Sequence, residues 1–128
     1  MKIKVEAEIK PSEDPTKVER AIKNIFPEID FKNDGDFLKG ESNKLEALEN
    51  LKNKLGLQAI RDSARRKLKS GKRNDKILFQ LNKQAATVSK INFYEAETPL
   101  GPIKVSIESE KTEDIIDYLA PKKENRKG

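Results

Sequence analysis

The alternation of apolar and charged residues at positions 2–10 restricts the fold more than any other feature of this chain. Ile3, Val5, Ala7 and Ile9 fall on one side of an extended strand, and every residue between them is Lys or Glu. Antiparallel sheets can leave one face in water, whereas parallel sheets are covered on both faces. The pattern therefore predicts an antiparallel sheet that is packed on one face only.

Caps, turn residues and apolar spacing predict the elements that follow. Asp14 and Pro15 are typical of the N-cap and first position of a helix, which stops before Pro27. A hairpin is predicted over residues 28–42, with its turn at Asn33-Asp34-Gly35-Asp36. Helical spacing is expected over residues 45–55, capped by Ser42 or Asn43, and again over residues 60–68, with Gly56 between them and Gly71 as the C-terminal cap.

Strand patterns return in the C-terminal half. Residues 77–81 are partly apolar on both faces and predict a central strand, and further strands are expected over residues 88–93 and 103–107. One helical turn is predicted at residues 82–86, and a last helix from Thr112 to before Pro121. The fold class expected is α+β, with a single mostly antiparallel sheet and helices packed on one face. Residues 1–121 are predicted to form a single domain, and residues 122–128 a disordered basic tail.

The residue types that are missing restrict the function. The chain has no Cys and no His, so it lacks thiolate ligands and the residue best suited to proton transfer near neutral pH. Carboxylate pairs such as Glu13-Asp14 stand at predicted helix starts, where the helix dipole accounts for them. The expectation is a protein that is not an enzyme and uses no metal or cofactor. Without an apolar run of membrane-spanning length or a signal-peptide core, a cytoplasmic location is expected.

Positive charge is concentrated in one part of the chain. Between Arg61 and Lys76, eight Lys or Arg residues face two Asp residues, which gives +6, whereas the whole chain carries +5. The tail after Pro121 adds +3, so the remainder carries −4. Such segregation favours phosphate binding, because each neutralised phosphate releases condensed counterions. A solvated helix face in a Lys-rich protein is the alternative interpretation.

Helical spacing places Arg61, Arg65 and Lys69 on one ridge, and Lys72 and Arg73 follow in a loop. These positions predict RNA binding through the phosphate backbone. The candidate RNA-binding residues are Arg61, Arg65, Arg66, Lys67, Lys69, Lys72, Arg73 and Lys76, with Lys83 and Lys90 as outliers.

Other RNA-binding features are weaker. Tyr94 is the one aromatic that could stack on a base, but a half-buried sheet residue is the more common role for such a tyrosine. Asn82, Lys83 and Gln84 follow a central strand, where they could contact sugar or phosphate or satisfy a local loop. A protein-interaction or dimerisation module without a nucleic-acid role is the second hypothesis. A third is an enzyme that holds a phosphorylated substrate on the basic segment.

Several short runs resemble an archaeal protein family. They are Lys10-Pro11-Ser12-Glu13-Asp14-Pro15, Ile25-Phe26-Pro27-Glu28, Ile60-Arg61-Asp62-Ser63-Ala64-Arg65, Leu81-Asn82-Lys83-Gln84-Ala85-Ala86 and Pro99-Leu100-Gly101-Pro102-Ile103. The family is described as predicted RNA-binding and exosome-subunit-related. The resemblance extends to Pro121 and implies a fold like that of large-subunit ribosomal protein L-five, a homodimer, a link to the ribosome or to RNA processing, and no enzyme activity. It supplies no functional residue.

Overall fold

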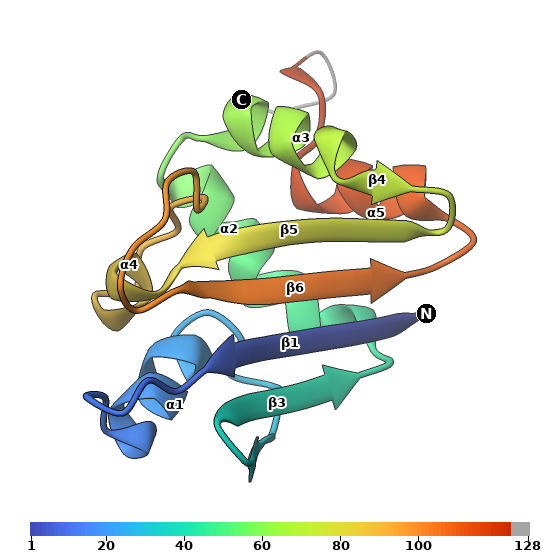
Figure 1. Cartoon of the computed structure of the whole chain (residues 1–128). Helices are drawn as coiled ribbons and strands as arrows, with labels where there is room; N and C mark the ends of the chain where they lie inside the picture. The colour runs from blue at the N-terminus through green and yellow to red at the C-terminus, as the bar shows by residue number, and fades with distance from the viewer. Residues whose placement is uncertain (124–128) are drawn as a thin grey trace.

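The computed structural model describes residues 1–123 and shows one sheet with helices on one side of it (Figure 1). The elements follow one another in the order β1 (Lys2–Glu8), α1 (Pro15–Lys23), β2 (Phe31–Asp34), β3 (Phe37–Ser42), the 3-10 helix η1 (Leu45–Leu48), α2 (Glu49–Leu57), α3 (Arg61–Ser70), β4 (Lys72–Arg73), β5 (Lys76–Asn82), α4 (Lys83–Thr87), β6 (Pro102–Glu108) and α5 (Thr112–Leu119). The tail predicted over residues 122–128 lies, from residue 124 on, outside the described residues.

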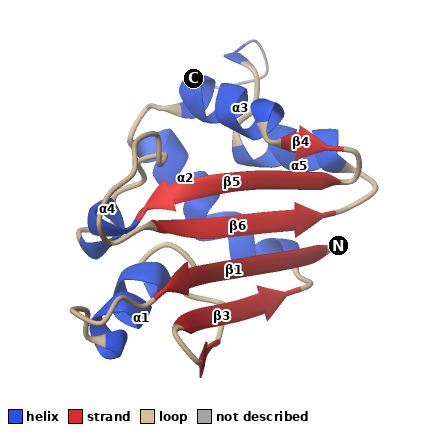
Figure 2. Cartoon of the chain, in the orientation of Figure 1, coloured by secondary structure: helices blue, strands red, loops and turns tan. Residues whose placement is uncertain are grey.

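The sheet has six strands in the order β2-β3-β1-β6-β5-β4, and neighbouring strands are antiparallel. Its centre joins the two ends of the chain, because β1 pairs with β6 and Val5 lies opposite Val105. Figure 2 shows α2 and α5 behind the strands, while α1 and α4 lie at the end of the sheet where β1 and β5 terminate. The α+β fold with a mostly antiparallel sheet is therefore confirmed.

The core lies between the sheet and the helices. Every second residue of β1, β5 and β6 is buried, and these side chains meet apolar side chains of α1, α2, α3 and α5. The alternate residues on the other face include Lys4, Glu6, Lys104 and Gln80, and none of the helices in the described part of the chain lies over that face. The alternation at positions 2–10 thus has the cause that the sequence predicts, a sheet with one dry face and one wet face.

Local sequence signals account for α1 and the first hairpin. The Asp14 carboxylate accepts a hydrogen bond from the backbone N–H of Thr16 at 2.9 Å, and Pro15 is the first residue of α1. Gly35 has φ of +64°, which the turn between β2 and β3 requires. Residues 83–87 form the predicted helical turn as α4, and α5 begins at Thr112 as expected.

Two predictions about elements are wrong. Residues 88–93 do not form a strand, because Ser89 adopts a left-handed φ of +58° and only Phe93 forms a bridge, to Leu81. The prediction of Gly71 as the C-terminal cap of α3 is confirmed, although its φ is −90° and not left-handed. Glycine is needed there for space, since a Cβ at this position would collide with the backbone carbonyl of Leu78. In addition, Lys44 precedes η1 without a side-chain cap, whereas Ser42 or Asn43 was expected to provide one.

The outer edge of β5 is covered in two pieces. The two-residue strand β4 pairs with its beginning, and Leu78 donates its N–H to the carbonyl of Gly71. Near its end, Asn82 donates to the carbonyl of Asn92, and Tyr94 donates to that of Gln80. β5 is therefore internal, as predicted, although only short segments separate it from the edge of the sheet.

Candidate nucleic-acid interface

Within residues 1–123, four of the eight cations in the 61–76 segment form ion pairs with carboxylates outside this segment. These pairs are Arg65–Asp117 at 2.7 Å, Lys67–Glu95 at 2.8 Å, Lys72–Glu113 at 3.0 Å and Lys76–Glu108 at 3.2 Å. With these four carboxylates counted, the local excess falls from six positive charges to two. The linear sequence therefore overstates the positive charge that this surface presents.

Three of these pairs are open to water. A hydrogen bond from Lys67 holds the pKa of Glu95 below its ordinary value, and Lys76 does the same for the pKa of Glu108. The pKa of Glu113 is lowered by its hydrogen bond from Lys72. Exposed ion pairs contribute roughly 0–1 kcal/mol to stability and are screened by salt. The lysines of these pairs are thus held weakly, and a stronger anion can replace the carboxylate.

Arg65 and Arg61 have structural positions. The Arg65 side chain is only 11% exposed, and its Nη1 donates to Asp117 and to the carbonyl of Ala120, which fastens α3 to the end of α5. The half-buried Arg61 lies against Gly56 of α2, where a Cβ would collide with its guanidinium. Both arginines flank the buried Ala64, so they face the neighbouring helices and not the solvent.

The outward side of α3 carries a different set of cations. Arg66, Lys69 and Arg73 are exposed, and within residues 1–123 none of them forms an ion pair. Arg73 donates from Nη1 to the carbonyls of Ser70 and Lys72 at 2.8 Å, which holds the guanidinium beside the end of α3. We call Arg66, Lys69 and Arg73 the basic ridge. Arg61, Arg65 and Lys69 do lie on one helix, beside the buried Ala64 and Leu68, but of the three only Lys69 is exposed. The RNA contacts expected of these residues stay a prediction.

Lys83 is not part of a phosphate-binding surface. Its side chain is 3% exposed, and its ammonium is bound by the carbonyls of Glu8 and Leu100, each at 2.7 Å, and by the Glu13 carboxylate at 3.0 Å. The prediction that it contacts RNA is wrong, because all three of its N–H donors are used inside the protein. Lys90, by contrast, is exposed, and no ion pair to it is found among the described residues.

The polar residues near the end of β5 have local partners. Asn82 caps α4 by accepting from the N–H of Ala85 at 2.9 Å. The hydroxyl of Tyr94 accepts from the N–H of Thr98 at 2.8 Å, and the ring is half-buried. Gln84 is exposed. Tyr94 is therefore a half-buried residue with a local hydrogen-bond partner, and not an exposed ring for base stacking. It lies beside the sheet and outside any strand.

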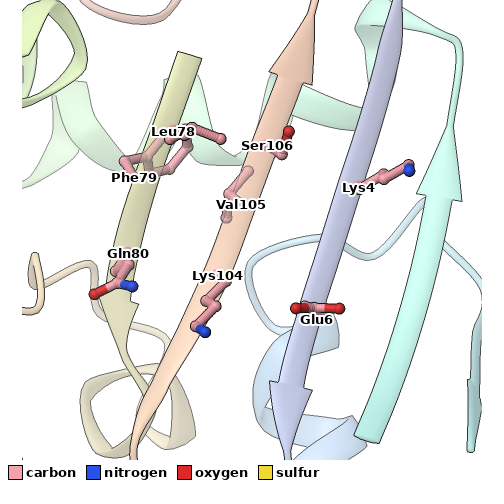
Figure 3. Close-up of a pocket in the computed structure, with 8 residues that line it drawn as sticks. All are labelled: Lys4, Glu6, Leu78, Phe79, Gln80, Lys104, Val105 and Ser106. Carbon is pink, nitrogen blue, oxygen red and sulfur yellow. The ribbon is translucent and has the colours of Figure 1, made fainter. Parts of the chain in front are cut away.

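The open face of the sheet has a shallow hollow of about 440 Å³ over β1, β6 and β5. Figure 3 shows Lys4, Glu6 and Lys104 projecting around it, with Ser106 and Leu78 nearby. Glu6 lies opposite Lys104 in the register, so basic and acidic side chains alternate across the strands. Because the charge is mixed and the Phe79 side chain is only 7% exposed, this face offers neither a phosphate surface nor a stacking platform.

Two further searches concern residues 1–123 only. No group of three or more acidic side chains gathers closely enough to hold a metal ion in this part of the chain. None of its helices is both long enough and apolar enough to cross a membrane.

Comparison with known proteins identifies the family. A family model described as "RNA binding" matches residues 2–109. A UPF0201 protein of Sulfurisphaera tokodaii is 43% identical over 94% of this chain and 88% of its own length, and one of Methanothermobacter thermautotrophicus is 40% identical over 94% and 91%. The chain therefore belongs to the family that this model describes, together with the archaeal UPF0201 proteins.

Solved structures agree with this assignment. The crystal structure of a UPF0201 protein superimposes with a TM-score of 0.87 at 31% identity, covering 100% of this chain and 99% of the other. A UPF0201 protein from Methanococcus jannaschii, solved at 2.2 Å, gives a TM-score of 0.82 at 34% identity over 98% and 96%. The resemblance seen in the short sequence runs is thus confirmed as to family, while the comparison with ribosomal protein L-five stays a prediction.

Proposed function

We propose that this member of the family binds RNA without catalysing a reaction, and that the basic ridge makes the contacts with the phosphate backbone. The observation that carries the proposal is the exposure of Arg66, Lys69 and Arg73 on α3 and β4, where none of the three forms an ion pair among the described residues, although the charge of Lys69 acts on the nearby Glu113. Arg66 and Lys69 are three residues apart on α3, the spacing of neighbours along one helix face, and Arg73 follows in β4 with its guanidinium bound to the carbonyls of Ser70 and Lys72.

The ion-paired lysines beside the ridge form a second group of contacts. Lys67, Lys72 and Lys76 lie on the same segment, and each is bound to an exposed carboxylate. An RNA phosphate that approaches the ridge competes with these carboxylates for the lysines. The ridge thus supplies the first contacts and the paired lysines add to them, a mode that recognises phosphate position more than base identity. Structured RNA of the ribosome or of RNA processing is the target class that fits it.

Replacing the ridge with alanines tests this function. The variant Arg66→Ala/Lys69→Ala/Arg73→Ala is expected to bind every RNA more weakly. The negative slope of log affinity against log salt should become shallower by about 2–3, because each phosphate contact contributes about 0.7–0.9 to its magnitude. Fluorescence anisotropy with a labelled structured RNA at several salt concentrations measures both quantities.

A matched variant separates position from net charge. Arg20→Ala/Lys32→Ala/Lys111→Ala also removes three exposed cations, but from α1, β2 and the loop before α5. We expect this variant to keep most of the affinity and the original slope. If the two triple variants weaken binding equally, the ridge is not the RNA site and the affinity comes from net charge alone.

A further inference from the structure

Three segments of the chain meet at Lys83, which lies at the end of the sheet beside α1 and α4. The ammonium of Lys83 joins the end of β1, at Glu8, to the turn before α1, at Glu13, and to the loop before β6, at Leu100. Glu13, Lys83 and Leu100 belong to three of the short runs in which the chain resembles the archaeal family. The phosphate-binding function uses none of them.

A pocket of about 280 Å³ opens beside this junction. Val18 and Leu100 supply apolar walls, and Lys17, Gln84 and Thr87 contribute polar groups. Its volume lies just below the roughly 300–1,000 Å³ usual for sites of small organic molecules. The pocket therefore suits one small planar group better than an extended ligand.

Glu13 provides the polar atom on which recognition depends. Its side chain is only 10% exposed, and its Oε1 accepts both from Lys83 at 3.0 Å and from the backbone N–H of Lys10 at 2.9 Å. Its other oxygen, Oε2, has no hydrogen-bond partner within residues 1–123, although Glu13 lines the pocket. Among the described residues Arg61 Nε, and not Oε2 of Glu13, is the buried side-chain atom without a partner. Oε2 is therefore open to solvent, and a donor from a ligand in the pocket can bind to it while Oε1 stays held by Lys83 and Lys10.

The charges around the pocket indicate a neutral ligand. The Glu13 carboxylate is balanced by Lys83, and the exposed Asp14 and Lys17 at the rim carry opposite charges. A cationic amine would find no net negative charge here. A neutral donor between apolar walls fits better, and carboxylates recognise the amino group of a nucleobase in this way.

We propose that this pocket takes one unstacked RNA base that carries an exocyclic amino group, with Oε2 of Glu13 accepting its hydrogen bond. The inference rests on the proposed RNA binding and adds base selection to it. The exposed Lys90 follows the pocket residue Thr87 by three positions. Its segment is fixed to the end of α2 by two hydrogen bonds between Gln58 and Ile91, and α3 begins a few residues after Gln58.

Cytosine and uracil are the matched pair for the test, because they are pyrimidines of nearly equal size and only cytosine has an exocyclic amino group. Oligocytidine of eight nucleotides is expected to bind about fivefold or more tightly than oligouridine of the same length at one salt concentration. Glu13→Gln keeps an oxygen for Lys83 and turns an N–H₂ group toward the pocket. This variant should bring the ratio to one or below, with an unchanged salt slope. Glu110→Gln, which removes the same charge at an exposed position far along the chain, should leave the ratio as it is.

A second measurement needs no variant. Free cytidine, titrated into isotope-labelled wild-type protein, should shift the backbone amide signals of Lys17, Gln84 and Thr87, and uridine should shift them much less. Equal binding of the two oligonucleotides, with a normal salt slope and no cytidine shifts, would overturn the base pocket and leave RNA binding intact. Cytidine shifts in a protein that binds neither oligonucleotide would support the pocket and refute the proposed function. Larger shifts with N-acetylarginine amide than with cytidine would overturn the base assignment in favour of a peptide ligand.

Discussion

Lys83 illustrates at the scale of one residue how a charge is accommodated inside a small domain. Its ammonium has three acceptors within 3.0 Å and almost no contact with water. Taking a charge out of water costs several kcal/mol, and that cost is offset only when the partners are complete. Lys83 therefore holds β1, the turn before α1 and the loop before β6 in fixed relative positions.

Removing the Lys83 ammonium is expected to destabilise the protein strongly. Lys83→Met leaves the Glu13 carboxylate buried without its cation, which should lower the free energy of unfolding by about 3–5 kcal/mol. Urea denaturation measures the change. The double variant Lys83→Met/Glu13→Leu removes both charges and should recover part of the loss. A single variant that loses less than about 1 kcal/mol would show that the pair is not important for the fold.

The positions of the basic residues could be read from the sequence, but their partners could not. Arg65 and Asp117 are 52 residues apart, and Lys83 and Glu13 are 70 apart. Helical spacing alone places Arg61 and Arg65 on a ridge with Lys69, and nothing local shows that α5 covers that side. The polar side of α3 was predictable in outline. Which cations are left exposed depends on the tertiary packing.

At the scale of elements, Gly71 fixes how closely α3 approaches the sheet. The residue ends α3, and its carbonyl accepts the N–H of Leu78 in β5. A Cβ here would collide with the Leu78 carbonyl oxygen, which belongs to the backbone and cannot rotate away. The passage from α3 to β4 and β5 therefore depends on a residue without a side chain.

The variant Gly71→Ala is expected to lower the free energy of unfolding by about 1–3 kcal/mol or more, because the added carbon forces backbone shifts. Gly35→Ala is the matched control. No atom lies within 4 Å of a Cβ there, and the residue has a left-handed φ of +64°, so a cost of about 1 kcal/mol is expected from conformation alone. Thermal unfolding of both variants compares the two costs. A smaller loss at Gly71 than at Gly35 would contradict the close approach.

Elements with their own start and stop signals were predictable. Asp14-Pro15 marks α1, Gly35 marks the first hairpin, and the alternation at positions 2–10 gives β1 with its correct buried face. Residues 88–93 have the composition of a strand, but Gln58 and Leu81 bind this segment at two points and leave it irregular. Such contacts come from distant parts of the chain, so no local pattern indicates them.

At the scale of the whole molecule, the distribution of ionisable groups determines how stability responds to pH. The pKa values of Glu95, Glu108 and Glu113 are lowered by hydrogen bonds from lysines. Such carboxylates stabilise the fold above their unfolded-state pKa, and that stabilisation is lost as the pH falls through their folded-state pKa. Burial raises the pKa of Tyr118, with Glu49 and Glu46 adding to the shift. The contribution of Tyr118 to stability is present below its unfolded-state pKa and is lost as the pH rises through its folded-state pKa.

The urea midpoint is therefore expected to stay nearly constant between about pH 6 and pH 8, since the chain has no histidine. It should decrease below about pH 4.5 and again above about pH 10, where unperturbed carboxylates and tyrosines titrate. Midpoints measured across this range check the prediction. A marked change between pH 6 and pH 8 would reveal a strongly shifted group that the structure does not indicate.

The pairing of β1 with β6 at the centre of the sheet affects how the chain folds during synthesis. Lys2 lies opposite Glu108 and Ala7 lies opposite Ile103, so the middle of the sheet joins strands about a hundred residues apart. A chain emerging from the ribosome can form α1 and the β1–β3 part of the sheet first, but the other edge of β1 then stays unpaired until β6 is made. Contacts of such long range slow folding, and an unpaired strand edge promotes association with other chains. The same pairing that closes the mature sheet thus leaves the nascent protein exposed to misassembly for most of its translation.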